Sequence, residues 1–248
     1  MTTSTAERQS GSVATGLVEY QMRFREILAR AAEGGKDAIA ASKSYGPFLT
    51  ISREAGSGGA EVARRIGSRL GWAVLDKELV NGLADDLKLE PRILQLMDES
   101  RANWFSETLL NLFNSRLVSQ HSYVDLIGKV VSLAASNGRT VIVGRGAHLV
   151  LPRTHGLRVR IVAPKINRIE STVSKEGLAP GAAAKHVDEL DADRRHFIRR
   201  NYQLDVADCS QYDLVVNTGT LGLDSSADVI VRALQLRGFG ADSPLSSD

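Results

Sequence analysis

A glycine-dense segment after the first apolar strand is the part of the sequence best suited to chemistry. It reads Ser52-Arg53-Glu54-Ala55-Gly56-Ser57-Gly58-Gly59-Ala60 and leads into a segment with helical spacing. In such a turn the backbone N–H groups converge on an anion, and the N-terminus of the following helix adds partial positive charge at the same point. We predict that Gly56, Ser57, Gly58, Gly59 and Ala60 bind phosphate. The alternative is a tight turn whose glycines serve only its geometry.

This turn resembles a P-loop but lacks two of its chemical groups. Gly59 stands where a P-loop has the lysine that reaches the β and γ phosphates, and Ala60 stands where it has the hydroxyl that ligates magnesium. Without the lysine, an active phosphotransferase needs another cation at the transferring group. Arg53 is the first candidate because it leaves the strand beside the turn, and Arg64 and Lys77 are weaker candidates.

Two further charged residues follow apolar strands. Arg145, between two glycines, comes two residues after the apolar residues 140–143, and Asp76 follows residues 72–75. Open α/β folds bind ligands at the carboxyl ends of their strands, where an arginine can hold a phosphate bidentately. Arg145 could instead pair with a structural carboxylate. Asp76 could hydrogen-bond a substrate or cap the helix that begins at residue 77.

A charged segment near the C-terminal end places three residues on one helix face. Asp188, Asp191 and Arg194 are spaced in steps of three, which brings them together on a helix. The pattern also fits an exposed, ion-paired helix face without function.

Strands and helices alternate along most of the chain. Apolar strands are predicted at 48–52, 72–75, 140–143, 157–162 and 213–217, and helices after the glycine turn to residue 70 and at 165–176, 184–202 and 224–236, with residues 91–137 helical in spacing. Strands rich in Val, Ile and Leu that alternate with helices favour a parallel sheet covered on both faces. We therefore predict an α/β fold with five parallel strands.

The ends of the chain differ from its centre. Residues 1–46 combine a polar tail, an amphipathic helix at 17–34 and a linker, residues 47–238 form one predicted domain, and residues 239–248 form a second tail. The 17–34 helix either packs on its own domain or forms a homodimer or partner contact.

Composition excludes several classes of protein. The 248 residues carry a formal net charge of +2, too small for non-specific binding to a nucleic acid polymer. No stretch approaches the roughly 18 apolar residues of a membrane span. Cys209 is the single cysteine, the five histidines lack metal-ligand spacing, and the first residues do not resemble a secretory signal. We expect a cytoplasmic protein with no membrane partner and no bound metal of its own.

Four motifs in sequence order resemble the cytidylate kinase-like family, which is related to bacterial cytidylate kinase. They are Ser-Arg-Glu-x-Gly-Ser-Gly-Gly at the turn, Leu-Gly-Trp-x-x-Leu-Asp-Lys-Glu-Leu from residue 70, Val-Ile-Val-Gly-Arg-Gly-Ala at 141–147 and Tyr-Asp-Leu-Val-Val-Asn-Thr at 212–218. The resemblance implies a P-loop NTPase-type sheet of five strands, a helical insertion at about 77–137 and a lid at about 178–205.

The resemblance also implies an activity and roles for individual residues. It implies phosphoryl transfer from ATP with Mg²⁺ to CMP or dCMP, with Arg145 on the acceptor phosphate and Arg194 closing from the lid. Asp76, Asp188 and Asp191 would contact the acceptor or orient the arginines. Magnesium would depend on water and phosphate oxygens.

Two departures from the family pattern limit what is carried over. Gly146 replaces the aspartate that reads cytosine in cytidylate kinases, and Val187 replaces an arginine before the lid motif. Two alternatives therefore remain: a nucleotide-binding regulatory protein with impaired catalysis, and a kinase of another small molecule.

Overall fold

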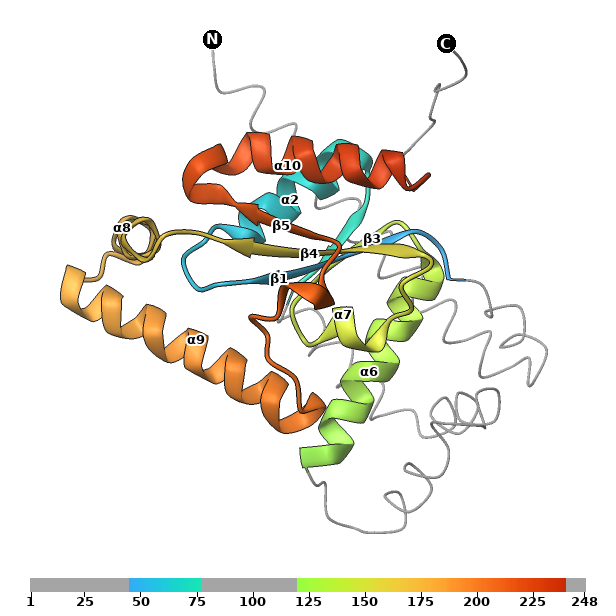
Figure 1. Ribbon diagram of the computed structural model, residues 1–248, viewed down its shortest axis with the longest axis horizontal. Coiled ribbons are helices and arrows are strands. Elements are labelled where there is room, and N and C mark those ends of the chain that lie inside the picture. The colour runs from blue at the N-terminus through green and yellow to red at the C-terminus, as the bar shows by residue number, and fades with distance from the viewer. Residues whose placement is uncertain (1–44, 77–119, 240–248) are drawn as a thin grey trace.

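The computed structural model describes residues 45–76 and 120–239, and a sheet of five parallel strands lies at its centre (Figure 1). The strands are β1 (Phe48–Arg53), β2 (Ala73–Leu75), β3 (Thr140–Val143), β4 (Gly156–Val162) and β5 (Leu214–Asn217). Their order across the sheet is β2-β3-β1-β4-β5, and every neighbouring pair is parallel. The predicted five-stranded α/β fold is confirmed.

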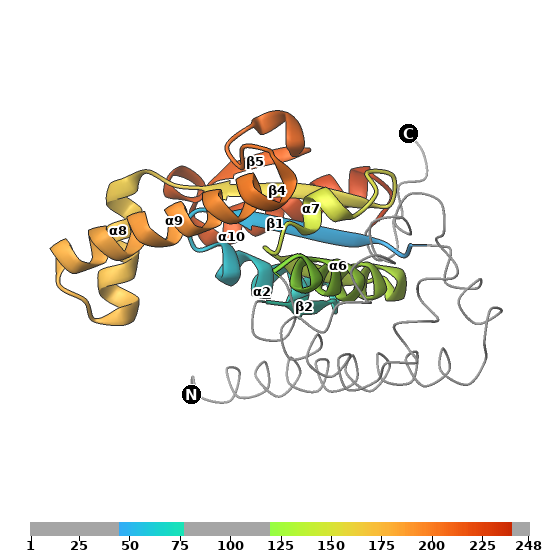
Figure 2. The same ribbon diagram turned by 90° about the horizontal axis from the view of Figure 1, so that it is seen from below.

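Helices cover both faces of this sheet and its carboxyl edge. They are α2 (Gly59–Leu70), α6 (Gln120–Asn137), α7 (Ala147–Val150), α8 (Lys165–Glu176), α9 (Pro180–Tyr202) and α10 (Thr218–Leu236). Helices α2 and α10 pack on one face and α6 and α7 on the other. Helix α8 lies beyond the carboxyl ends of the strands, and α9 runs from there back along the side of α6 and α7 (Figures 1 and 2). None of the described helices is long and apolar enough to cross a membrane.

The core lies between the sheet and the helices α2 and α10. Strand β1 is buried along Phe48–Ser52, as expected for a central strand covered on both faces. On the helical side, Ile66 of α2 and Ile230 of α10 are fully buried in the same apolar cluster. This packing fixes the start of α2 directly against the end of β1, where the glycine turn lies.

Element boundaries agree with the prediction to within a residue for the strands and differ at two helices. Helix α9 begins at Pro180 rather than 184, because proline is well suited to the first turn of a helix. Helix α10 begins at Thr218, but Gly222 (φ 73°, ψ 175°) interrupts it, so the regular part begins close to the predicted residue 224. The predicted helix at 17–34 and residues 77–119 of the predicted insertion lie outside the described residues.

The chain leaves two adjacent strands in opposite directions. Strand β1 leads into α2 on one face, whereas β3 leads through the Gly-Arg-Gly run to α7 on the other. In open parallel sheets such a switch point leaves a crevice at the carboxyl ends of the strands, which is the usual place for a ligand.

Candidate functional site

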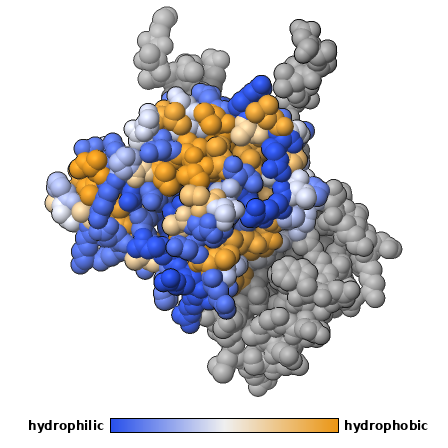
Figure 3. All heavy atoms as spheres, in the orientation of Figure 1, coloured by the Kyte–Doolittle hydropathy of each residue, from blue (hydrophilic) through white to orange (hydrophobic). Residues whose placement is uncertain are grey.

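A pocket of about 430 Å³ occupies this crevice, between the ends of β1 and β3 and the inner side of α9. Its charged lining consists of Arg53, Arg145, Arg160, Arg194 and Arg195 with Glu54, Asp191 and Asp193. Five arginines against three carboxylates make the pocket attractive to anions. Figure 3 shows hydrophilic residues over α9, whereas apolar residues gather over α10 and β5.

The glycine turn is held in a defined shape by the surrounding backbone. Gly56 (φ +73°) and Gly58 (φ +77°) adopt left-handed conformations that favour glycine. The Ser57 hydroxyl donates to the Glu54 carbonyl at 2.8 Å, and the Thr218 hydroxyl donates to the Ser57 carbonyl at 2.7 Å. Within the described residues no side chain caps the N-terminus of α2. Its first N–H groups are therefore available to an anion.

The Arg53 side chain passes over the last part of the glycine turn and ends at the switch point, at the end of β3. A Cβ atom at Gly59 would lie 2.6 Å from the Arg53 Cβ, and one at Gly144 would clash with the Arg53 guanidinium. The stem of Arg53 therefore passes over Gly59, and its guanidinium lies at Gly144, directly after β3. The glycine that replaces the P-loop lysine leaves the space that the Arg53 stem fills.

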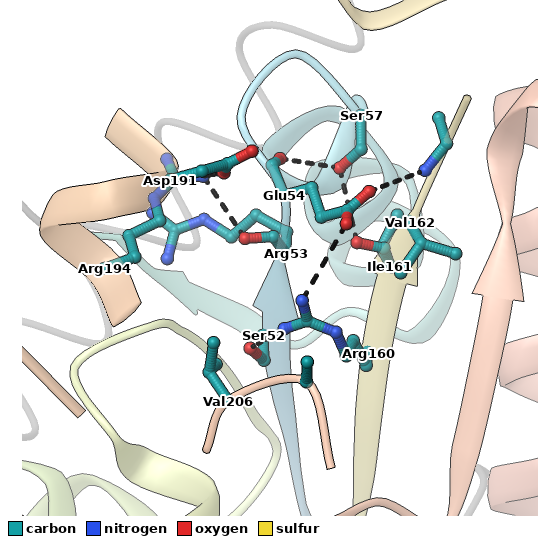
Figure 4. Close-up of polar contacts among 12 residues, drawn as sticks. Ser52, Arg53, Glu54, Ser57, Arg160, Ile161, Val162, Asp191, Arg194 and Val206 are labelled. Carbon is teal, nitrogen blue, oxygen red and sulfur yellow. Dashed lines mark hydrogen bonds and ion pairs between the residues drawn. The ribbon is translucent and has the colours of Figure 1, made fainter. Parts of the chain in front are cut away.

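Two predicted lid residues contact the turn directly, and Figure 4 shows the hydrogen bond from Arg194 to Arg53. An Asp191 carboxylate oxygen accepts the Ala55 N–H at 2.7 Å, and Arg194 Nη1 donates to the Arg53 carbonyl at 3.2 Å. Burial lowers the pKa of Arg194, Asp191 opposes that shift, and Arg160 and Arg168 add to it. An arginine remains charged in spite of such a shift, so α9 brings a cation to the turn.

Other predicted site residues lie apart from this contact. Asp188 pairs with Lys165 at 2.8 Å, and both side chains are more than half exposed. Arg64 pairs with Glu61 on the outer side of α2. Asp76 follows β2 and is not among the residues that line the pocket. Of the three equally spaced residues, Asp191 and Arg194 therefore contact the turn, whereas Asp188 lies in an exposed ion pair.

Glu54 and Arg160 belong to the site but were not predicted from the sequence. The Glu54 carboxylate accepts the Ala163 N–H at 3.1 Å and lies 3.9 Å from Arg160 Nη2. Arg160 also donates to the Ser52 hydroxyl at 3.3 Å (Figure 4). A signal for Arg160 was present, since a charged residue in a strand buried on both faces needs a polar partner.

The turn provides no protein ligand for the magnesium ion that the family implies. Ala60 has no polar side-chain atom, and the Ser57 hydroxyl is bound to a backbone carbonyl. Glu54 lies between Arg160 and Arg168, and Asp191 pairs with Arg168. These residues do not fit a protein-held magnesium ion, which would have to be held by substrate oxygens and water.

A buried histidine lies on the wall of the pocket. His148 of α7 is 3% exposed and stacks on Tyr212, with ring centroids 4.9 Å apart. Burial, with smaller contributions from the positive Arg158 and Arg160, lowers the pKa of His148 from 6.5 to about 4. The imidazole is therefore neutral at physiological pH.

We predict that His148 makes the fold sensitive to acid. The unfolded chain binds the histidine proton near pH 6.5, whereas the folded protein binds it only near pH 4. His148 therefore does not reduce the free energy of unfolding above pH 6.5. As the pH decreases from 6.5 toward 4, this group lowers the free energy of unfolding by up to about 3 kcal/mol. Urea unfolding at several pH values tests this. His148→Gln should flatten the pH dependence, and the exposed His196→Gln should not; equal slopes for both variants would contradict the assignment.

Taken together, these features define a class: an α/β protein with an uncapped glycine turn after its first strand and an arginine-rich pocket at the switch point. The profile of the cytidylate kinase-like family matches residues 48–220, and the chain belongs to this family. The resemblance predicted from the four motifs is confirmed. Membership supports a kinase-like, nucleotide-binding function.

Among individual proteins, one solved structure supports the fold. An uncharacterized protein from Eubacterium ventriosum is 20% identical, with a TM-score of 0.62 over 76% of this chain and 98% of that one. TT1252 from Thermus thermophilus is 16% identical, with a TM-score of 0.45 over 78% and 98%. A Corynebacterium glutamicum uronate isomerase is 34% identical over 99 residues, which is 40% of this chain but only 19% of that enzyme. The chain thus spans about a fifth of that curated relative.

Proposed function

We propose that the protein transfers a phosphoryl group from ATP, with Mg²⁺, to a nucleoside monophosphate, with CMP or dCMP as the first candidates. The observation that carries the proposal is the meeting of an uncapped helix N-terminus and an arginine-rich pocket, with Arg194 of α9 at their junction. Phosphoryl transfer needs mainly positioning and positive charge, and this arrangement offers both.

Each charged group has a role in the proposed reaction. The N–H groups of residues 56–60 hold the donor phosphates, and Arg145 with Arg53 holds the acceptor phosphate at the end of β3. An acceptor oxygen attacks the γ-phosphorus, the bond to the β-phosphate oxygen breaks, and ADP leaves with that electron pair. Arg194 neutralises the charge that is shared between donor and acceptor in the transition state.

The test is ADP formation from ATP and Mg²⁺ with CMP, dCMP, UMP, AMP or GMP, with binding of each nucleotide measured in parallel. Turnover with one monophosphate supports the proposal and identifies the acceptor. Arg53→Ala and Arg145→Ala should each lower that turnover, and unchanged turnover in both would overturn the assigned roles. Arg64→Ala is the matched control, because Arg64 pairs with Glu61 outside the pocket.

One observation favours a second function, nucleotide binding without transfer. Gly59 removes the P-loop lysine, and the Arg53 guanidinium lies at Gly144 rather than over the turn. This reading predicts binding of ATP without ADP formation for every monophosphate. If turnover appears only with a different phosphate acceptor, the protein is a kinase of another small molecule.

A further inference from the structure

Arg168, in the first turn of α8, is buried behind the pocket and does not line it. Its side chain donates from Nε to the Ala163 carbonyl at 3.0 Å and from Nη1 to the Ala55 carbonyl at 3.2 Å. Nη1 also donates to the second carboxylate oxygen of Asp191 at 2.5 Å. The side chain is 10% exposed, so these bonds form where water does not compete.

These bonds close a ring around Ala55. The Ala55 N–H donates to Asp191, Asp191 accepts from Arg168, and Arg168 donates to the Ala55 carbonyl. Both peptide groups of Ala55 are thereby fixed, immediately before the left-handed Gly56. Three elements meet in this ring: the glycine turn, the start of α8 and the inner side of α9.

Arg168 is also the middle member of a chain of alternating charges. Glu54 lies 3.5 Å from Arg168 and 3.9 Å from Arg160, and Asp191 lies 3.8 Å from Arg194. The two outer arginines line the pocket, and the two carboxylates contact different nitrogens of Arg168, Glu54 near Nε and Asp191 at Nη1. Without Arg168, both carboxylates would lose their closest cation, which is unfavourable above all for Asp191, whose side chain is only 13% exposed.

We propose that Arg168 is the positioning residue that holds the glycine turn and α9 in one arrangement. It acts through Asp191 and Ala55, so that the turn N–H groups and Arg194 face the same phosphates. This inference deepens the proposed phosphotransferase function and rests on it for its catalytic consequence. Its structural consequence, a fixed Ala55, does not depend on turnover.

The first test is Arg168→Lys, which keeps the charge but not the planar fork that reaches three oxygens. We expect kcat to fall by about 10- to 100-fold, because a small misplacement of reacting groups costs about that much. KM for both nucleotides should change less than about threefold, since the phosphate-binding groups remain. The matched control is Lys165→Gln, which removes an exposed ion pair between the same two helices and should leave kcat unchanged.

The second test needs no activity and uses hydrogen exchange of the Ala55 amide by NMR. Arg168→Lys should speed this exchange by about tenfold or more relative to wild type, and Lys165→Gln should not. Asp191→Asn, which weakens the same ring, should also speed it. Unchanged Ala55 exchange in Arg168→Lys overturns the proposal. If the wild type transfers no phosphate while Ala55 still responds, the proposed function fails and the positioning role of Arg168 stands.

Discussion

Gly56→Ala is expected to lower the unfolding free energy by about 2–4 kcal/mol and to weaken ATP binding at least tenfold. A Cβ atom at this position would clash with the Arg168 carbonyl and lie 2.9 Å from its carbon, both of which belong to the backbone of α8. The left-handed φ of +73° adds about 1–2 kcal/mol for a residue with a side chain. The turn must therefore shift away from α8, and its N–H groups no longer converge.

Gly71→Ala separates the two causes of this loss. Gly71 is also left-handed, with φ +63°, but a Cβ atom there would meet nothing within 4 Å. We expect it to cost only the backbone strain, about 1 kcal/mol, and to leave ATP binding unchanged. Thermal unfolding and titration with ATP measure both quantities. Equal destabilisation by the two substitutions would show that packing against α8 contributes nothing.

The fold was largely predictable because its strands are continuous apolar runs between clear turn signals. Strand β3 was predicted with its exact bounds, and β4 began one residue earlier than expected. The order of the strands was not predicted, since periodicity does not say which strands are neighbours. Helix α9 shows a further limit, because its start at Pro180 precedes the first apolar repeat.

The sequence predicted which residues lie at the ends of the strands. It did not predict the directions in which their side chains point or the partners that they contact. Arg53 was placed correctly at the end of β1, but two missing Cβ atoms, at Gly59 and Gly144, direct its side chain to β3. No local pattern marks Arg168, because its partners Ala55 and Asp191 are 113 and 23 residues away. Ala55 and Arg168 come close together only in the folded sheet, where the carboxyl ends of β1 and β4 lie side by side.

The loss of the lysine and the course of Arg53 are two aspects of one arrangement. A side chain at residue 59 would have to share space with the Arg53 stem, which lies 2.6 Å from the position of a Cβ atom there. Restoring the lysine alone would therefore disturb Arg53 instead of recreating a P-loop. Arg194 donates to the Arg53 carbonyl from α9, and in the proposed reaction it would supply positive charge at the turn.

Arg145→Gly is expected to lower kcat/KM for the acceptor nucleotide by about 100-fold, the usual cost of losing a bidentate phosphate contact. The same change should not lower stability through the backbone. Arg145 has a left-handed φ of 58°, which costs a non-glycine residue about 1–2 kcal/mol. Glycine removes this strain, but it also makes the unfolded chain more flexible, which cancels about half of the stability gained. Backbone strain held at a functional position is typical of binding sites.

Arg139→Gly is the matched control, because it relieves the same backbone strain at a position outside the pocket. Arg139 is exposed, has φ 49° and lies between α6 and β3, away from the pocket. It should gain about 0.5–1 kcal/mol of stability, measured by urea unfolding, with unchanged turnover. Any shortfall of Arg145→Gly against this gain measures what the Arg145 side chain contributes to folding. If both variants kept full turnover, Arg145 would have no role in binding the acceptor, and its strained backbone would need a purely structural reason.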